Sequence, residues 1–210
     1  MNQPPLRDVL ALSGTNAVVT GSSTGLSRRI AIRLAGAGAR VCIVHDRSGE
    51  ALTTIGQIVA RGGEGHFIHL SGEGDDPAHR AVALCERTFG RVDLVVNNQG
   101  PRATMRAVAR RMFGAQRGSI VQIDPIANFA PSASPIHDDG SRAALAVMTE
   151  KLAISRYEIC CDDAEPPPSR AQRAISSALS RYVERGDVAT ATVCLASRAA
   201  SGFAGARVMI

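Results

Sequence analysis

Residues 17–37 read AVVTGSSTGLSRRIAIRLAGA, and this stretch decides the fold. Its first three residues are typical of a short buried strand, and the small residues that follow predict a turn. Leu26, Ile30 and Leu34 then recur every four residues, which predicts a helix with one apolar face that ends near Gly36 and Gly38. A strand, a glycine turn and a helix in this order direct free backbone N–H groups and a positive helix end toward a phosphate.

The same alternation continues along the chain. Further strands are predicted at residues 41–45, 67–70, 92–96, 119–123, 159–161 and 207–210. Six further helices are predicted, one of which begins at Pro77 and another of which is a long helix over 141–155. In chain order, their apolar faces are predicted to contain Leu52, Ile55 and Val59; Val82, Cys85 and Phe89; Met105, Val108 and Met112; Leu145, Met148 and Leu152; Ile175, Leu179 and Tyr182; and Val188, Ala191 and Leu195.

Strands that alternate with helices predict an α/β fold, a doubly wound parallel sheet with helices on both faces. We expect about seven strands in the order 3-2-1-4-5-6-7, in a single domain over residues 1–210. The three prolines at 166–168 mark the clearest break in the pattern, and we interpret them as a rigid loop.

Composition and charge exclude several classes of protein. The net charge of +5 comes almost wholly from scattered arginines and aromatic residues are only 3%, so no nucleic-acid partner is predicted. No apolar run is long enough to cross a bilayer, and residues 1–5 are not typical of a signal peptide, so we expect a cytoplasmic protein with no membrane partner. The five cysteines include no C-x-x-C pair, which favours free thiols and no metal site.

Five stretches in order carry a family resemblance: TGSSTGL at 20–26, VDLVVNNQG at 92–100, GSIVQI at 118–123, SRAAL at 141–145, and residues 187–205. The first resembles the cofactor turn of short-chain dehydrogenases/reductases, and the second resembles their Asn-Asn-Ala-Gly strand, with Gln99 in place of alanine. The third resembles the family's fifth strand, and the fourth resembles the start of its catalytic helix. The last resembles its closing helix and strand. The resemblance covers most of the chain. It implies a Rossmann-like, three-layer αβα fold.

The resemblance also implies an NAD or NADP site. Its contacts would come from Gly21, Ser23, Thr24, Gly25, Leu26, Asp46, Asn97 and Gly100. Ser27 replaces the family's third glycine and His69 its adenine-contacting aspartate, and both replacements count against tight binding. The choice of cofactor stays open, because Asp46 favours the free 2′-hydroxyl of NAD whereas Arg47 favours a 2′-phosphate. Weak or lost binding is the alternative, since a glycine turn also folds well without a ligand.

The catalytic residues of the family do not align. Without a gap, its serine falls on Pro125, its tyrosine on Asp138 and its lysine on Arg142. Proline has no hydroxyl, an aspartic acid is ionised at neutral pH, and arginine is a poor proton carrier. The segment that carries the family's catalytic asparagine is missing after Gly100.

A shift of the alignment does not restore the catalytic residues. The two tyrosines are Tyr157, predicted near the far end of the long helix, and Tyr182, after the prolines. Neither has lysine or arginine four residues later. We therefore predict a catalytically silent member, a pseudoenzyme that acts through assembly or nucleotide binding.

The alternative is an NAD(P)-dependent oxidoreductase, or a lyase-type enzyme, with an unorthodox site around His137, Asp138 and Arg142. A simpler interpretation of these residues is a helix start in which Asp138 pairs with Arg142.

The resemblance implies an oligomer, either a homodimer or homotetramer or a heteromer with a catalytic relative. The expected interface is formed by the helices at 102–113 and 141–155. Its apolar surface would comprise Val108, Met112, Ala144, Val147 and Met148.

Overall fold

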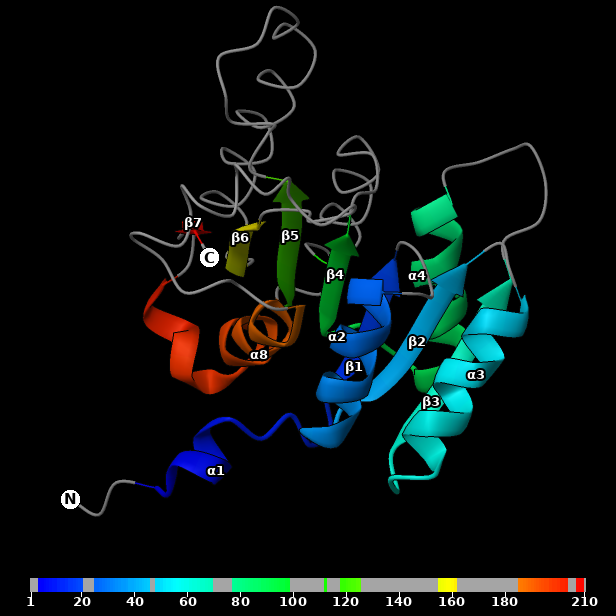
Figure 1. The fold of residues 1–210 in the computed structure, drawn as a ribbon, viewed down its shortest axis with the longest axis horizontal. Coiled ribbons are helices and arrows are strands. Elements are labelled where there is room, and N and C mark those ends of the chain that lie inside the picture. Colours follow the sequence, from blue (N-terminus) through cyan, green and yellow to red (C-terminus); the bar gives the residue numbers. More distant parts are fainter. Residues whose placement is uncertain are drawn as a thin grey trace, which may run out of the picture.

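The computed structural model describes residues 4–20, 25–45, 48–69, 77–98, 112, 118–125, 155–161, 185–203 and 207–209. Seven strands form one sheet in the order β3-β2-β1-β4-β5-β6-β7, with every neighbouring pair parallel (Figure 1). The strands are β1 Asn16–Thr20, β2 Arg40–His45, β3 Glu64–His69, β4 Leu94–Asn98, β5 Ser119–Pro125, β6 Ser155–Cys161 and β7 Arg207–Met209. The predicted fold class and strand order are confirmed.

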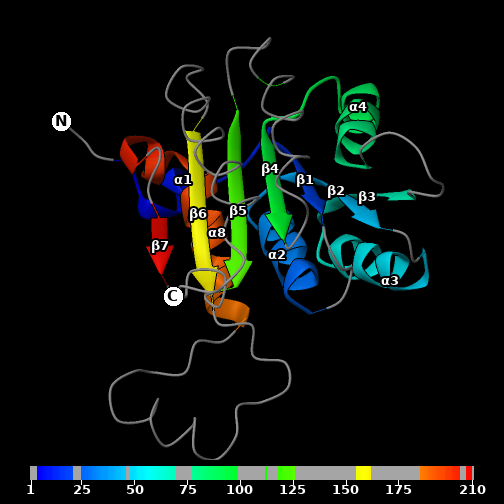
Figure 2. The same cartoon turned by 90° about the horizontal axis from the view of Figure 1, so that it is seen from above.

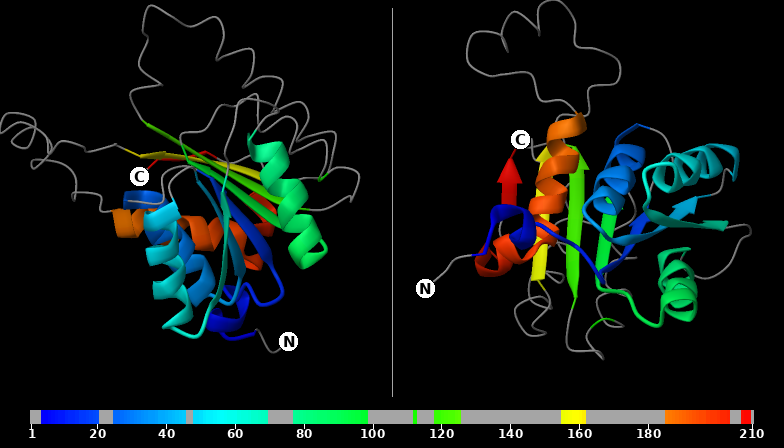
Figure 3. Two further views of the ribbon diagram at one scale, coloured as in Figure 1. Left: turned by 90° about the vertical axis from the view of Figure 1, so that its right-hand side faces the viewer. Right: turned by 90° about the horizontal axis from the view of Figure 1, so that it is seen from below.

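Helices cover both faces of the sheet (Figures 2 and 3). On one face lie α2 Gly25–Gly36, α3 Ser48–Val59 and α8 Arg185–Ala196. On the other lies α4 Pro77–Phe89, which begins at its predicted proline. A short helix α1, Leu6–Val9, precedes β1, and a 3-10 helix η2, Arg198–Phe203, follows α8.

The central strands have no solvent-facing side. In β1, Ala17 and Val19 belong to the core beneath α2, α3 and α8, whereas Val18 belongs to the core beneath α4. All three are at most 1% exposed. A parallel strand buried on both faces is an uninterrupted apolar run, which is why residues 17–19 predict it correctly.

The prediction for α3 is wrong at two positions. Leu52 and Val59 are each 59% exposed, whereas Ala51 and Ile58 are at most 1% exposed and form the buried face. The helix carries apolar residues on more than one side, so apolar spacing alone does not choose the side that packs. The buried face follows the helical spacing of Ala51, Thr54, Ile55 and Ile58, and Leu52 lies on another side of the helix.

Met112 is a second correction. It was expected on an assembly surface, but it is 2% exposed and packs with Val18, Val95 and Ile120 in the core beneath α4. Its side chain also approaches Gly118, whose φ of +133° favours glycine. Met112 therefore completes the core of the monomer. The other predicted interface residues lie outside the described residues.

Two of the cysteines form a buried pair between β2 and α4. Cys42 and Cys85 are free thiols, both fully buried. Their mutual hydrogen bond, together with burial, raises the pKa of Cys85 far above its ordinary value. This thiol therefore stays protonated and acts as a packing residue. No group of three or more His, Cys, Asp or Glu side chains that could hold a metal occurs within the described part of the chain.

None of the helices in the described ranges has the length and apolar character needed to cross a membrane.

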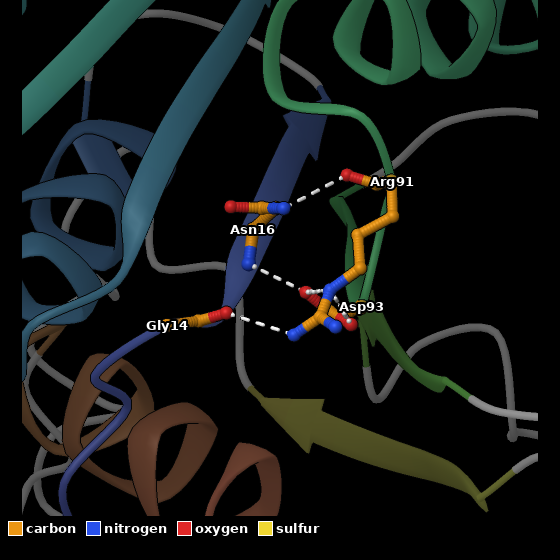
Figure 4. A network of polar contacts seen from close by, with 4 residues as sticks. All are labelled: Gly14, Asn16, Arg91 and Asp93. Carbon is orange, nitrogen blue, oxygen red and sulfur yellow. Dashed lines mark hydrogen bonds and ion pairs between the residues drawn. The ribbon is translucent and has the colours of Figure 1, made fainter.

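A polar network fixes the amino ends of β1 and β4 (Figure 4). The Asp93 carboxylate accepts hydrogen bonds from the backbone N–H of Asn16 and from Nε of Arg91, both at 3.0 Å. Arg91 also donates from Nη2 to the Gly14 carbonyl at 3.1 Å, and its own carbonyl accepts from Nδ2 of Asn16 at 3.0 Å. This network lies at the sheet edge opposite the carboxyl ends of the strands.

Removal of the Asp93 carboxylate tests the network. We expect Asp93→Ala to lower the free energy of unfolding by about 1–3 kcal/mol, because the buried N–H of Asn16 and the Arg91 guanidinium lose their acceptor. The measurement is urea denaturation. Asp8→Ala is the control, since Asp8 pairs with Arg7 at 3.6 Å on an exposed surface, and we expect it to change stability by less than about 0.5 kcal/mol. Equal stability of the two variants would contradict the assignment.

Candidate functional site

The candidate site lies where the strand order reverses. β1 has β2 on one side and β4 on the other, so the chain winds outward in both directions from the β1–β4 pair. Because all strands are parallel, their carboxyl ends meet at one edge. In doubly wound sheets, ligands bind beyond this edge at the point of reversal. Thr20 ends β1, Asn98 ends β4 and Pro125 ends β5 at this edge.

The helix α2 begins beside the end of β1. Its first residue, Gly25, has φ +58°, a left-handed conformation that glycine adopts at little cost. The first N–H groups of a helix have no partner within the helix and carry a partial positive charge. A helix of 12 residues that starts at this edge is therefore suited to bind an anion such as a phosphate.

A buried row of polar side chains joins the three central strands at this edge. Thr20, Asn97 and Gln122 are 8%, 0% and 1% exposed, and they occupy matching register positions on β1, β4 and β5. The Thr20 hydroxyl donates to Oδ1 of Asn97 at 2.7 Å, and Nδ2 of Asn97 donates to Oε1 of Gln122 at 2.8 Å. We refer to these three residues as the polar row.

The polar row redefines the role of Asn97. The resemblance made this residue a cofactor contact, yet its side-chain amide is fully buried and bonded to two neighbouring strands. Its side chain therefore holds the strand ends together. The signal in the sequence was Gln122, a polar residue inside the apolar run of β5, but only the register places it beside Asn97.

The next residue of β4 points to the opposite face of the sheet, because side chains alternate along a strand. There Asn98 donates from Nδ2 to Oγ of Ser27 at 2.8 Å. The Ser27 hydroxyl in turn donates to the Thr20 carbonyl at the longer distance of 3.4 Å. Ser27 and Asn98 are 3% and 6% exposed, so this contact is buried between α2 and the sheet.

Tyr157 lies in a strand, not at the end of a helix as predicted. It is in β6, in register with Val121 of β5, and Ser155, predicted as the last residue of the long helix, begins this strand. The helical spacing of the preceding apolar residues predicts a helix as far as Ser155. Tyr157 and Ile159 are two residues apart, however, and this spacing is typical of a strand.

Of the residues predicted to bind a cofactor, the structure describes Gly25, Leu26 and Asn97. Leu26 is 8% exposed and packs in the core beneath α2, so its side chain serves the fold. Pro125 is the last residue of β5, which extends two residues beyond the strand predicted at 119–123. The other predicted site residues lie outside the described residues: Gly21, Ser23, Thr24, Asp46, Gly100, His137, Asp138 and Arg142.

Comparisons with known proteins agree with this architecture. The family model described as short chain dehydrogenase matches residues 15–103, from the start of β1 to just past β4. The L-rhamnose 1-dehydrogenase (NAD(P)(+)) of Azotobacter vinelandii is 28% identical over 247 aligned positions that cover 96% of each chain. Since this alignment is longer than the 210 residues of the chain, it contains gaps on this side.

Two further known proteins are similar to this chain, one over 69% of it and the other over 97% of it. The (+)-borneol dehydrogenase 2 of Salvia officinalis is 28% identical over 69% of this chain, which spans only 60% of that relative's length. A 7α-hydroxysteroid dehydrogenase, solved in complex with NADH and 7-oxo glycochenodeoxycholic acid, superposes with a TM-score of 0.79 at 23% identity, over 97% of this chain and 95% of that one. This last likeness concerns the fold alone.

The fold and the strand-end geometry define a doubly wound, Rossmann-like α/β domain. The family model of short-chain dehydrogenases matches residues 15–103, and a dehydrogenase aligns with this chain over nearly its whole length. The chain is thus similar to the short-chain dehydrogenase/reductase family.

The polar row can be tested at its centre. We expect Asn97→Ala to lower the free energy of unfolding by about 1–3 kcal/mol, because the bonds to Thr20 and Gln122 are lost in a buried site. Chemical denaturation is the measurement. Thr88→Ala is the control, since the Thr88 hydroxyl is exposed and, within the described ranges, bonds only to the Leu84 carbonyl of its own helix. If Asn97→Ala is as stable as Thr88→Ala, the polar row does not contribute to the stability of the fold.

Proposed function

We propose that this chain is a dinucleotide-binding member of the short-chain dehydrogenase/reductase family that does not perform the family's hydride transfer. One observation carries the proposal: Pro125 ends β5 at the edge where the strand order reverses. The resemblance requires a serine hydroxyl there to orient a substrate carbonyl. Proline has neither a hydroxyl nor a backbone N–H, so it offers no donor.

The features around α2 support nucleotide binding. A 12-residue helix begins with a left-handed glycine at the carboxyl end of β1, beside the buried polar row. The family-model match also covers this half of the chain. We propose that Gly21, Ser23, Thr24, Gly25, Leu26 and Gly100 form the walls of the site through their backbone and that Asp46 faces the ribose. Asn97 acts indirectly, through the polar row.

Residues beyond the family-model match also support the absence of hydride transfer. Asp138 and Arg142 stand where the resemblance requires tyrosine and lysine, and Tyr157 is held in β6. The gaps in the alignment with the rhamnose dehydrogenase are in keeping with a shortened chain. We propose that one deletion follows Gly100 and removes the segment that carries the catalytic asparagine.

The competing proposal is an oxidoreductase or lyase-type enzyme that uses His137, Asp138 and Arg142. The names of the relatives favour oxidoreductase chemistry: one is an L-rhamnose 1-dehydrogenase and another a (+)-borneol dehydrogenase. In this case Asp138 would have to be held protonated by its surroundings in order to donate a proton.

Calorimetric titration with NAD(H) and NADP(H), together with an assay of hydride transfer on ketones and alcohols, tests the proposal. We expect binding of at least one dinucleotide and no turnover. Gly25→Ala should weaken binding by about tenfold, because an alanine at φ +58° is strained. Gly36→Ala is the control, since a Cβ at Gly36 would meet nothing within 4 Å.

Two results would contradict this proposal. The absence of binding to any of the four dinucleotides would exclude a nucleotide-binding role. Turnover that is abolished by Asp138→Asn but kept by His137→Ala would establish Asp138 as an acid and favour the enzyme.

We also propose that the chain assembles with a second copy or with a catalytic relative, as the resemblance implies. Because Met112 is buried in the monomer, the remaining interface candidates are Val108, Ala144, Val147 and Met148. Light scattering at micromolar concentration should show a dimer or tetramer that Val147→Glu dissociates, because a carboxylate cannot be buried unpaired at low cost. A monomer whose mass is unchanged by this substitution would contradict the proposal.

A further inference from the structure

The hydrogen bond between Ser27 and Asn98 joins two elements that are 71 residues apart in the sequence. Ser27 lies in the first turn of α2, and Asn98 is the last residue of β4. Asn98 Nδ2 lies 2.8 Å from Ser27 Oγ, whose hydroxyl approaches the Thr20 carbonyl at 3.4 Å. One serine hydroxyl thus contacts the ends of β1 and β4 from the helix that starts beside them.

The side chain of Ser27 faces the sheet and not the proposed nucleotide site. Its 3% exposure and its two partners show that the hydroxyl is enclosed between helix and strands. In dinucleotide-binding turns, a glycine at the third position allows helix and strand to pack closely. A serine retains close packing here because its hydroxyl bonds to the strands it approaches. The substitution that counted against binding therefore adds a contact that glycine cannot make.

Asn98 depends strongly on this contact. Its side chain is 6% exposed, and within the described residues its Oδ1 has no hydrogen-bond donor. The amide is therefore held through Nδ2 alone among these residues. Without the serine oxygen, a buried amide would lose this partner, and a buried amide without partners is unfavourable. Loss of this bond would favour a shift of the end of β4 or the entry of a water molecule beside it.

The positions of these two residues link the bond to the site. Ser27 directly follows residues 21–26, and Asn98 directly precedes residues 99 and 100, and both segments contribute to the proposed nucleotide site. A bond between Ser27 and Asn98 thus fixes the spacing between the first turn of α2 and the end of β4, the two elements that adjoin these segments. Site residues hold a ligand well only when the groups behind them are themselves fixed.

We propose that Ser27 is a positioning residue for the nucleotide, which acts through Asn98 to hold the carboxyl end of β4 against the start of α2. This inference rests on the proposed dinucleotide binding and assigns to Ser27 a role in affinity that the family's glycine does not have.

A double-mutant cycle tests the proposal. The dissociation constant of the dinucleotide bound by the wild-type chain is measured by calorimetry for Ser27→Ala, Asn98→Ala and the double variant, well below the melting temperature of each. We expect each single variant to weaken binding by about three- to tenfold, as the loss of one buried hydrogen bond implies. The double variant should bind no more weakly than the singles, because both changes remove the same contact.

The matched control removes a buried hydroxyl from a different place. Thr192 is fully buried in α8, and among the described residues its hydroxyl donates only to the Val188 carbonyl of the same helix, at 2.8 Å. Thr192→Val should lower the melting temperature without changing the dissociation constant. This control separates positioning from a general loss of stability.

The outcomes distinguish the inference from the function on which it rests. If the wild type binds no dinucleotide, the proposed function and this inference both fail. If the wild type binds and Ser27→Ala binds equally well, only the inference is overturned. The inference is also overturned if Thr192→Val weakens binding as much as Ser27→Ala, or if the effects of Ser27→Ala and Asn98→Ala multiply in the double variant.

Discussion

The pairing of one buried amide, that of Asn97, is the interaction on which the rest of this site depends. A buried amide is unfavourable unless its donor and acceptor groups are bonded, and Asn97 is 0% exposed. Asn97 meets this requirement through Thr20 on one side and Gln122 on the other. These bonds require β1, β4 and β5 to keep one register. The register then brings the strand ends and the start of α2 to a common edge, where a nucleotide can approach backbone N–H groups.

The adjacent pair Asn97 and Asn98 serves both faces of the sheet. Because strand side chains alternate, the first asparagine completes the polar row on the α4 face and the second reaches Ser27 on the α2 face. The family's architecture is thus preserved in the half that the family model matches. Pro125 and Tyr157 lie beyond that half, where we propose that the residues of the family's chemistry are replaced. Fold and chemistry have separate requirements, so one can persist without the other.

The sequence predicts the strand order because each buried parallel strand is an apolar run, as in residues 17–19, and glycine or proline marks the turns. It fails where several packings satisfy the same pattern. Leu52 and Val59 have helical spacing, yet the smaller Ala51 packs on the sheet. Tyr157 suits a helix end or a strand, and only its pairing with Val121 decides. The bond from Asn98 to Ser27 could not be predicted, because it depends on the distance between a helix and a strand that the sequence does not encode locally.

The most direct test of the central claim, that a dinucleotide binds where β1 and β4 diverge, is an NMR titration of the ¹⁵N-labelled chain with NADH and NADPH. We expect the amide signals of Leu26, Ser27 and Asn98 to shift with added nucleotide. The amides of Asn16 and Asp93, at the opposite edge of the sheet, should not shift and serve as the internal reference. Shifts confined to that opposite edge, or no shift at Leu26, Ser27 and Asn98 at saturating nucleotide, would show that no dinucleotide binds where β1 and β4 diverge.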